Sequence, residues 1–376
     1  MMRRDKCPIC GDGDANYLDT FPDMPVRMGT TTDSPTKDLI CDQSWLICDH
    51  CGCVYLHDLI DPEVLYAVSH NPGAVGEVWN KHHAEFGRYV ADRSGEDIVE
   101  FGAGTDKLAE IIIGHTNIRE YTIVDPNPIL SRVIPQVSAI AEFLTPEFST
   151  DLGNVDTIVH SHTMEHFYDV AGCIKKMAEI LPIGGKMIFS VPLIDCALTR
   201  GHHNGIGFEH TYMTTMTNIE RVLATNGFCI EDVTFFNYVN VFVTATRNSE
   251  IDVELVNEYI TNKAIFVDYK KNLTTKYTDL LVHLEAAPFK PTFIFGAHLF
   301  SQTPLTLVPE LLYHITAVLD NDPTKVNKRL YGVYGMLVMN PNILATMDAR
   351  VIVDVGQYEY EIVRDLKKIN PNLEII

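Results

Sequence analysis

The chain is poor in basic residues. Its 376 residues include 29 Lys and Arg against 50 Asp and Glu, for a net charge of −21. A protein that binds nucleic acid needs a basic surface to displace counterions from phosphates, and residues 1–120 contain no basic cluster beyond Arg3 and Arg4. We therefore expect no nucleic-acid partner, and a site for a nucleotide-linked substrate would have to be locally positive.

Long hydrophobic runs are also absent. Although 46% of the residues are hydrophobic, no apolar run approaches the ~18 residues that cross a bilayer. The first residues are basic but no apolar segment follows them, which is unlike a signal peptide. We expect a cytoplasmic protein with no membrane partner, divided into two or three domains because one core does not usually grow to this length.

Strands and helices alternate in the middle of the chain, which favours a parallel, doubly wound α/β sheet. A helical pattern over 61–93, with Val75 and Val78 in its apolar spacing, precedes it. The expected strands are 97–101, 120–124, 155–160 and 186–191, the expected helices are 108–113, 170–181 and 217–225, and an antiparallel pair over 228–235 and 239–246 closes the sheet.

A second, smaller α/β unit is expected at the C-terminal end. Residues 249–286 form a mainly helical connector with one apolar face, made of Val253, Val256, Ile260, Ala264 and Val267. Strands over 293–295, 315–319 and 349–355 follow. Gly296 and Asp320 mimic half of a nucleotide site, but one glycine is a weak fingerprint, so we favour a supporting or substrate-holding role. The predicted domains are 1–60, 61–248 and 249–376.

Six of the nine cysteines lie in the first 53 residues. Cys7-x-x-Cys10-Gly and Cys48-x-x-Cys51-Gly are paired knuckles, and four thiolates in this spacing complete a tetrahedral zinc shell. With all four positions filled by sulfur, the metal has no open site, so its role is structural. Cys41 and Cys53 are spare, although Cys53 could replace one ligand.

The segment from Val99 to Asp106 is a glycine turn between a strand and a helix. Gly102 and Gly104 allow a ligand to approach the backbone. Glu100 is placed to meet an ammonium group, and Asp125, after the next strand, to hold two ribose hydroxyls. The third glycine of a dinucleotide fingerprint is replaced by Lys107. These features resemble motif I of class I methyltransferases, and we expect S-adenosylmethionine as the cofactor, with nicotinamide and a ligand-free sheet as weaker alternatives.

A histidine-rich loop follows the strand at 186–191. It contains His202, His203, Glu209, His210 and Tyr212, and it lies at the carboxyl ends of the strands, where such sheets bind ligands. Histidine suits removal of a proton near neutral pH. One of His160, His162 and His166 is also expected near the substrate, and His160 is included with the cofactor-binding residues.

The whole arrangement resembles the C-methyltransferases of nucleotide-linked keto-deoxy sugars, which have a four-cysteine zinc domain, a methyltransferase domain and a C-terminal Rossmann-like domain. The resemblance rests on the two cysteine knuckles, on Glu100-x-Gly102-x-Gly104 and on the stretch from Phe208 to Tyr212. It implies that Glu209 and His210 flank the reacting carbon, with His210 as the base. The family's tyrosine falls on Gly207 and its preceding histidine on Phe208, so Tyr212, His202 or His203 substitutes, or the chemistry differs.

The sequence therefore predicts a zinc-containing methyltransferase that acts on a small sugar-like substrate, with His210, Glu209 and Tyr212 as catalytic candidates. O-methylation of a sugar or other metabolite is the alternative. A non-catalytic zinc and Rossmann binding module, and a ribosomal-RNA methyltransferase with an N-terminal zinc motif, are rivals; the acidic charge disfavours the latter. The chain also lacks the Asn/Asp-Pro-Pro-aromatic stretch of amino methyltransferases that modify adenine. Neither the sugar nor the oligomeric state is specified.

Overall fold

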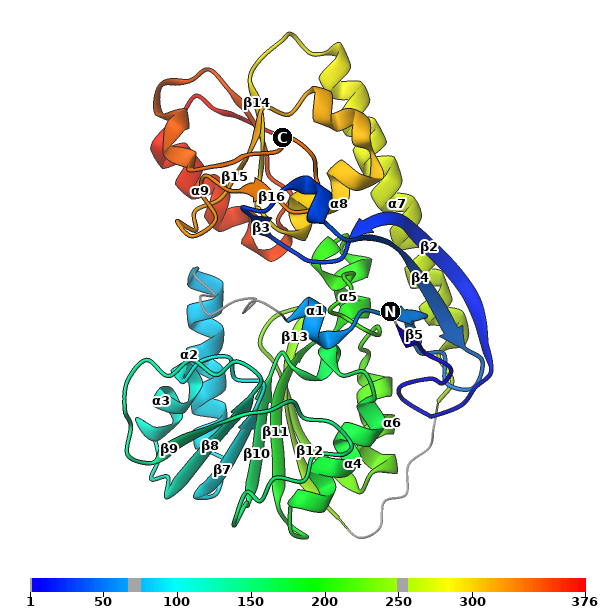
Figure 1. Ribbon diagram of the computed structural model, residues 1–376, viewed down its shortest axis with the longest axis vertical. Coiled ribbons are helices and arrows are strands. Elements are labelled where there is room, and N and C mark those ends of the chain that lie inside the picture. The colour runs from blue at the N-terminus through cyan, green and yellow to red at the C-terminus, as the bar shows by residue number, and fades with distance from the viewer. Residues whose placement is uncertain (1, 67–75, 249–255) are drawn as a thin grey trace.

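A seven-stranded sheet forms the centre of the protein, as a computed structural model describes it for residues 2–66, 76–248 and 256–376 (Figure 1). Its strand order is β12-β13-β11-β10-β7-β8-β9, and β13 runs antiparallel to both of its neighbours, β12 and β11, whereas the other pairs are parallel. The strands are β7 (Asp97–Phe101), β8 (Glu120–Asp125), β9 (Val137–Ala141), β10 (Thr157–Ser161), β11 (Lys186–Pro192), β12 (Phe228–Phe235) and β13 (Asn240–Arg247). This confirms the predicted class I methyltransferase fold and its antiparallel closing pair.

Helices cover both faces of this sheet. On one face, α2 (Glu77–Ala91) and α3 (Lys107–Ile113) pack against strand residues such as Ile98 and Val159. On the other, α4 (Val170–Ile180) and α6 (Met216–Thr225) pack against Ile158 and its neighbours. The central strands β7, β10 and β11 are buried on both faces because of this layering. The predicted helix over 61–93 consists of α1 (Pro62–Leu65) and α2, and Val75 lies outside the described residues.

The C-terminal unit contains a five-stranded parallel sheet of order β17-β15-β14-β18-β19. Its strands are β14 (Thr292–Phe295), β15 (Ala317–Leu319), β17 (Val338–Met339), β18 (Arg350–Ile352) and β19 (Glu374–Ile375), with helices α8 (Leu299–Leu307) and α9 (Glu359–Ile369) and the 3-10 turns η4 (Pro309–Tyr313), η5 (Pro341–Thr346) and η6 (Gly356–Tyr358). Gly296 follows β14 with φ 98°, and its neighbour Ala297 donates its amide to Asp320 at 2.9 Å. The expected second α/β unit is thus present.

The connector α7 (Tyr259–Ala286) buries a different face from the predicted one. Ile260 is 79% exposed, and Val256 and Val267 are also exposed, whereas Phe266 and Tyr269 are buried; Val253 lies outside the described residues. The N-terminal segment decides the orientation, because Phe266 packs against Phe21 and Trp45 with ring centroids 6.0 and 5.4 Å apart. Large aromatic rings outweigh small aliphatic side chains in buried area.

The N-terminal segment forms a ribbon that runs along α7 to the C-terminal sheet (Figure 1). Its strands β2 (Ala15–Pro25), β4 (Ile40–Cys48) and β5 (Val54–Leu56) are antiparallel. At its far end β3 (Thr30–Thr31) pairs with β16 (Arg329–Leu330). The remaining elements are β1 (Met2–Arg3), paired with β6 (Asp58–Leu59), and η1 (Pro35–Lys37). Among the described residues, no helix is both long and apolar enough to span a membrane.

Candidate active site and metal centre

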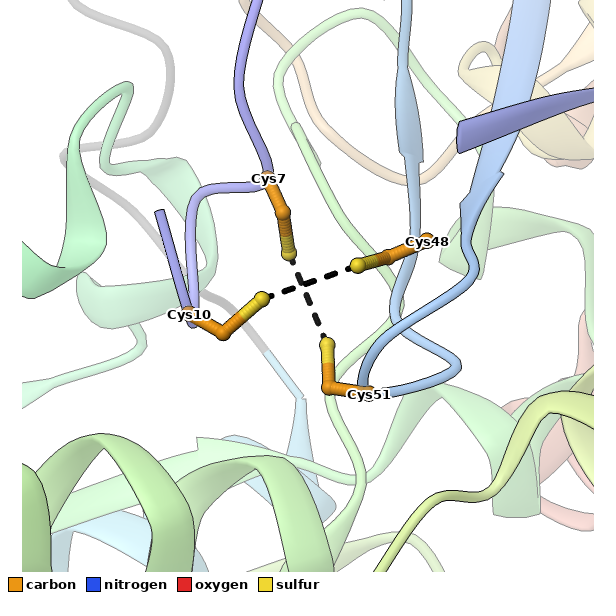
Figure 2. Close-up of side chains that lie close together, drawn as sticks. All are labelled: Cys7, Cys10, Cys48 and Cys51. Atoms are coloured by element: carbon orange, nitrogen blue, oxygen red, sulfur yellow. Dashed lines mark hydrogen bonds between the residues drawn. The ribbon is translucent and has the colours of Figure 1, made fainter. Parts of the chain in front are cut away.

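The four predicted cysteine ligands converge on one point, although 37 residues separate the two knuckles (Figure 2). The sulfurs of Cys7 and Cys51 lie 3.6 Å apart, as do those of Cys10 and Cys48, and all four lie within 4.8 Å of one another. Zinc–sulfur bonds of about 2.3 Å in a tetrahedron place the sulfurs about 3.8 Å apart. The donor set and its spacing therefore fit a structural zinc ion.

Glycines end both knuckles in the left-handed region that favours this residue. Gly11 has φ 74° and Gly52 has φ 76°, and their amides donate to the carbonyls of Cys7 and Cys48 at 3.0 and 2.9 Å. Cys53 is fully buried, but its sulfur points to the Val54 carbonyl oxygen at 3.7 Å and lies outside the four-cysteine group.

The knuckle is joined to the histidine-rich loop. Strand β5 begins just after Cys51–Cys53, and it pairs with the loop: Leu56 donates its amide to Thr211 at 3.0 Å and Met213 donates to Val54 at 2.8 Å. The buried guanidinium of Arg4 also donates to the Thr211 carbonyl, at 2.8 Å. Folding of the cysteine knuckles thus fixes the backbone on both sides of Tyr212.

Gly102, Gly104 and Asp125 are brought together as predicted from the sequence. Both glycines have positive φ, 71° and 63°. Asp125 accepts the Gly104 amide at 2.9 Å and the Asn127 amide at 2.7 Å, so its carboxylate lies at the end of β8 beside the glycine turn. A Cβ on Gly102 would overlap Thr163, which leaves space for no residue but glycine where the turn meets the loop after β10.

Glu100 lies beneath this turn. It is 2% exposed and accepts the Tyr121 hydroxyl at 2.7 Å. Burial raises the pKa of the Glu100 carboxyl to about 8, against the effect of the Tyr121 hydrogen bond, and Asp125 raises it further. In the folded protein without cofactor, Glu100 is therefore largely protonated at neutral pH.

This protonation predicts a pH-dependent stability. The unfolded chain ionises Glu100 above its ordinary pKa of 4.5, so the stabilisation is full below pH 4.5 and is lost as pH rises to about 8, by about 5 kcal/mol at most. Glu100→Gln keeps an acceptor for Tyr121 but has no charge to bury. Denaturant unfolding should show the variant gaining stability relative to wild type between pH 5 and 8; parallel pH profiles would contradict it.

His160 lies on β10 under the loop that follows the strand. Its ring stacks on Phe189, with centroids 4.7 Å apart, and neither nitrogen has a hydrogen-bond partner among the described residues. Burial lowers its pKa to about 3, so the imidazole is neutral. The ring is fully buried.

His210 and Glu209 come from the loop that β5 braces. His210 directs Nδ1 to the Gly205 carbonyl at 3.2 Å, and its ring lies 5.1 Å from that of His166. Burial lowers the pKa of His210 to about 4, with His166 acting in the same direction and Glu165 opposing. Glu209 is 4% exposed, and its backbone carbonyl accepts a hydrogen bond from Nδ1 of His166 at 2.9 Å.

The side chains of Tyr212, His202 and His203 do not reach the group formed by His210, Glu209 and His166. Tyr212 is fully buried, with its hydroxyl 3.4 Å from the Met164 carbonyl oxygen, and it packs in the core. His203, in η3 (His203–Gly205), lies against Tyr277 and Asp354 of the C-terminal half, beyond α5 (Ile194–Thr199). His202 packs on Gly356.

Glu165 was not among the residues predicted from the sequence for this site, although it lies in its centre. This carboxylate, in η2 (Met164–His166), is 1% exposed and lies 3.4 Å from Nδ1 of His162. His162 itself has φ 51°, a conformation that is uncommon outside glycine and that clusters at functional sites. The run from His160 to His166 is visible in the sequence, but only the fold shows which of its side chains face the loop at 205–212.

Comparison with known proteins agrees with the fold. A family model described as a methyltransferase domain matches residues 75–233. An uncharacterised methyltransferase of Geobacillus kaustophilus is 26% identical over 155 residues, covering 37% of this chain and 72% of the relative. A probable S-adenosylmethionine-dependent methyltransferase of Mycolicibacterium smegmatis is 26% identical over 170 residues, 43% of this chain and 63% of the relative.

Among solved structures, the N-methyltransferase NodS of Bradyrhizobium japonicum, in complex with S-adenosylhomocysteine, is 16% identical with a TM-score of 0.34, over 47% of this chain and 90% of that one. The sequence matches identify the central part of the chain as a methyltransferase domain.

Proposed function

We propose that this S-adenosylmethionine-dependent methyltransferase acts on a small sugar-like molecule, with a nucleotide-linked keto-sugar as the favoured substrate class. The observation that carries the proposal is the meeting of two loops beside the cofactor turn. Thr163 packs against Gly102, and two residues later the Glu165 carbonyl accepts the amide of Thr211 at 3.1 Å. Glu209 and His210 are thereby held next to the loop that borders the turn.

In this mechanism Gly102 and Gly104 would hold the cofactor, with Asp125 at its ribose and Glu100 and His160 behind it, and the cofactor would supply an activated methyl group. His210, aided by Glu209, takes a proton from the acceptor. The electron pair left on the acceptor would then bond to the methyl carbon that the cofactor supplies, with the carbon–sulfur pair leaving on sulfur. Tyr212 is a catalytic candidate from the sequence; in this proposal its role is to support the loop from the core.

The sugar assignment is supported by the resemblance to sugar C-methyltransferases, which includes the group of Cys7, Cys10, Cys48 and Cys51. For this group we propose a zinc ion. The division into 1–60, 61–248 and 249–376 belongs to the same proposal. O-methylation of a sugar hydroxyl is the second candidate, because Gly207 and Phe208 replace two residues of the C-methylating pattern.

The direct test is conversion of the cofactor with a panel of acceptors. We expect S-adenosylhomocysteine to form with keto-deoxy sugar nucleotides and not with RNA, since the chain carries a net charge of −21. Nuclear magnetic resonance of the product would then show a new C–CH₃ or O–CH₃ group. Cofactor that binds but is never converted with any sugar would contradict the proposal and favour a binding module.

A further inference from the structure

A second group of metal-ligand side chains lies beside the histidine-rich loop. Glu165, His166 and His210 each place one ligand atom within 4.8 Å of the others, and Nε2 of His166 is 4.0 Å from the Glu165 carboxylate. Ligand atoms at about 2.1 Å from one ion stand up to about 4.2 Å apart. Small side-chain rotations therefore bring all three onto a single ion.

Both imidazoles are oriented as metal ligands are. Nδ1 of His166 faces the Glu209 carbonyl at 2.9 Å, and Nδ1 of His210 faces the Gly205 carbonyl at 3.2 Å. A carbonyl accepts only from N–H, so each Nδ1 carries the proton and each Nε2 presents its lone pair. Metal-binding histidines have this backbone contact on their second nitrogen, because it fixes the tautomer and the ring.

The carboxylate supplies the second, independent observation. Its oxygen Oε2 is buried and has no hydrogen-bond partner among the described residues, and the Glu165 side chain is only 1% exposed. A buried carboxylate oxygen without a hydrogen-bond partner is costly, and a cation at this point would offset that cost.

We propose that Glu165, His166 and His210 bind a divalent first-row transition-metal ion, separate from the zinc of the four cysteines. Two imidazoles and one carboxylate leave coordination positions open to water or substrate. The His166 side chain is 24% exposed while Glu165 is buried, so the open positions face the accessible side of the cluster.

This inference rests on the proposed function and deepens it. An ion at the cluster occupies Nε2 of His210 and replaces that nitrogen in activating the acceptor, because it holds the acceptor hydroxyl oxygen and lowers the pKa of that hydroxyl. The proton would leave to water, the oxygen pair would bond to the methyl carbon, and the carbon–sulfur bond would break with its pair on sulfur. The ion-loaded site therefore favours transfer to a hydroxyl oxygen, which is the O-methylation given above as the second candidate.

The test is Mn²⁺ binding to the zinc-containing full chain, followed by calorimetry and by the Mn²⁺ electron paramagnetic resonance signal. Wild type should bind one Mn²⁺ beyond its zinc. Glu165→Gln, which keeps the size of the side chain, and His210→Ala should each weaken Mn²⁺ binding by about 100-fold or more, since each removes a ligand. His202→Ala is the matched control, because His202 lies in the same loop but packs on Gly356, and it should bind Mn²⁺ as wild type does.

Mn²⁺ that binds Glu165→Gln as tightly as wild type, or a wild-type protein that binds no ion beyond the cysteine site, overturns the inference. If Glu165→Gln does not fold, the Mn²⁺ affinities of His210→Ala and His202→Ala decide: equal affinities would overturn the inference. No sugar is present in this experiment, so its failure leaves the proposed function untouched. Conversely, a bound second ion with no turnover of any sugar would refute the substrate class and not the metal site.

Discussion

Cys48→Ser is expected to remove zinc from the protein, lower its melting temperature and reduce turnover by about 100-fold or more, since small misplacements of catalytic groups have effects of this size. A structural zinc site contributes about 10 kcal/mol to folding of its domain. The loss reaches the active site because β5 follows the knuckle directly and pairs with the loop at Leu56 and Met213. Without the metal, this pairing loses its anchor and Glu209 and His210 are no longer positioned.

Metal analysis, thermal unfolding and a turnover assay measure the three effects separately, and amide hydrogen exchange at Leu56 and Met213 measures the pairing of β5 with the loop. Cys41→Ser is the matched control, because Cys41 is on β4 but outside the four-cysteine group, and it should keep zinc, stability and turnover. Zinc that stays bound to Cys48→Ser would refute the four-thiolate shell. Zinc loss with normal exchange and turnover would instead refute the link from knuckle to loop.

In the protein without an ion at Glu165, His166 and His210, His210→Ala is expected to lower the rate of methyl transfer by about 10²- to 10⁴-fold, the range of general-base contributions, with the affinity for S-adenosylmethionine unchanged. The affinity should stay because this imidazole is held at the Gly205 carbonyl and next to Glu165, whereas the cofactor turn is built from Gly102, Gly104 and Asp125. Single-turnover formation of S-adenosylhomocysteine measures the rate, and calorimetry measures cofactor affinity.

The pH profile sharpens this prediction. Because burial lowers the pKa of His210 to about 4, the wild-type rate should fall only as pH drops toward 4, not through the ordinary histidine pKa of 6.5. His202→Ala serves again as the control and should keep the wild-type rate. Persistent turnover in His210→Ala would show that another base is at work, with His162 beside Glu165 the next candidate.

Local patterns predicted those parts of the site that neighbouring residues determine. The two knuckles and the glycine turn were recognisable because fixed spacing and special backbone angles leave a mark on sequence. The strand β9 was not predicted, since only Val137 and Ile140 of its five residues are partly buried and its pattern is weak. The cluster of Glu165 with His210 joins residues 45 apart, and no periodicity encodes such a meeting.

The wrong face of α7 has a related origin. Spacing alone selected Val256, Ile260 and Val267, whereas the fold buries Phe266 and Tyr269 against the N-terminal ribbon. A helix that is apolar on several sides can be oriented only by what packs on it, and here the partner lies more than 200 residues earlier in the chain. Tertiary packing overrides the local pattern in such cases.

The ribbon of β2 and β4 has a consequence for dissecting this enzyme. It carries cysteine ligands at one end and a hairpin docked on the far unit at the other, where Arg329 donates to Asp38 at 2.6 Å and Gly29 donates to Gln302 at 3.1 Å. A cut of the chain at residue 60 or 248 would expose, on both resulting pieces, apolar surface that is buried in the intact protein. We therefore expect the three regions to unfold as a single cooperative unit. Replacing one region by its counterpart from another enzyme would require the contacting surfaces of its neighbours to be replaced as well.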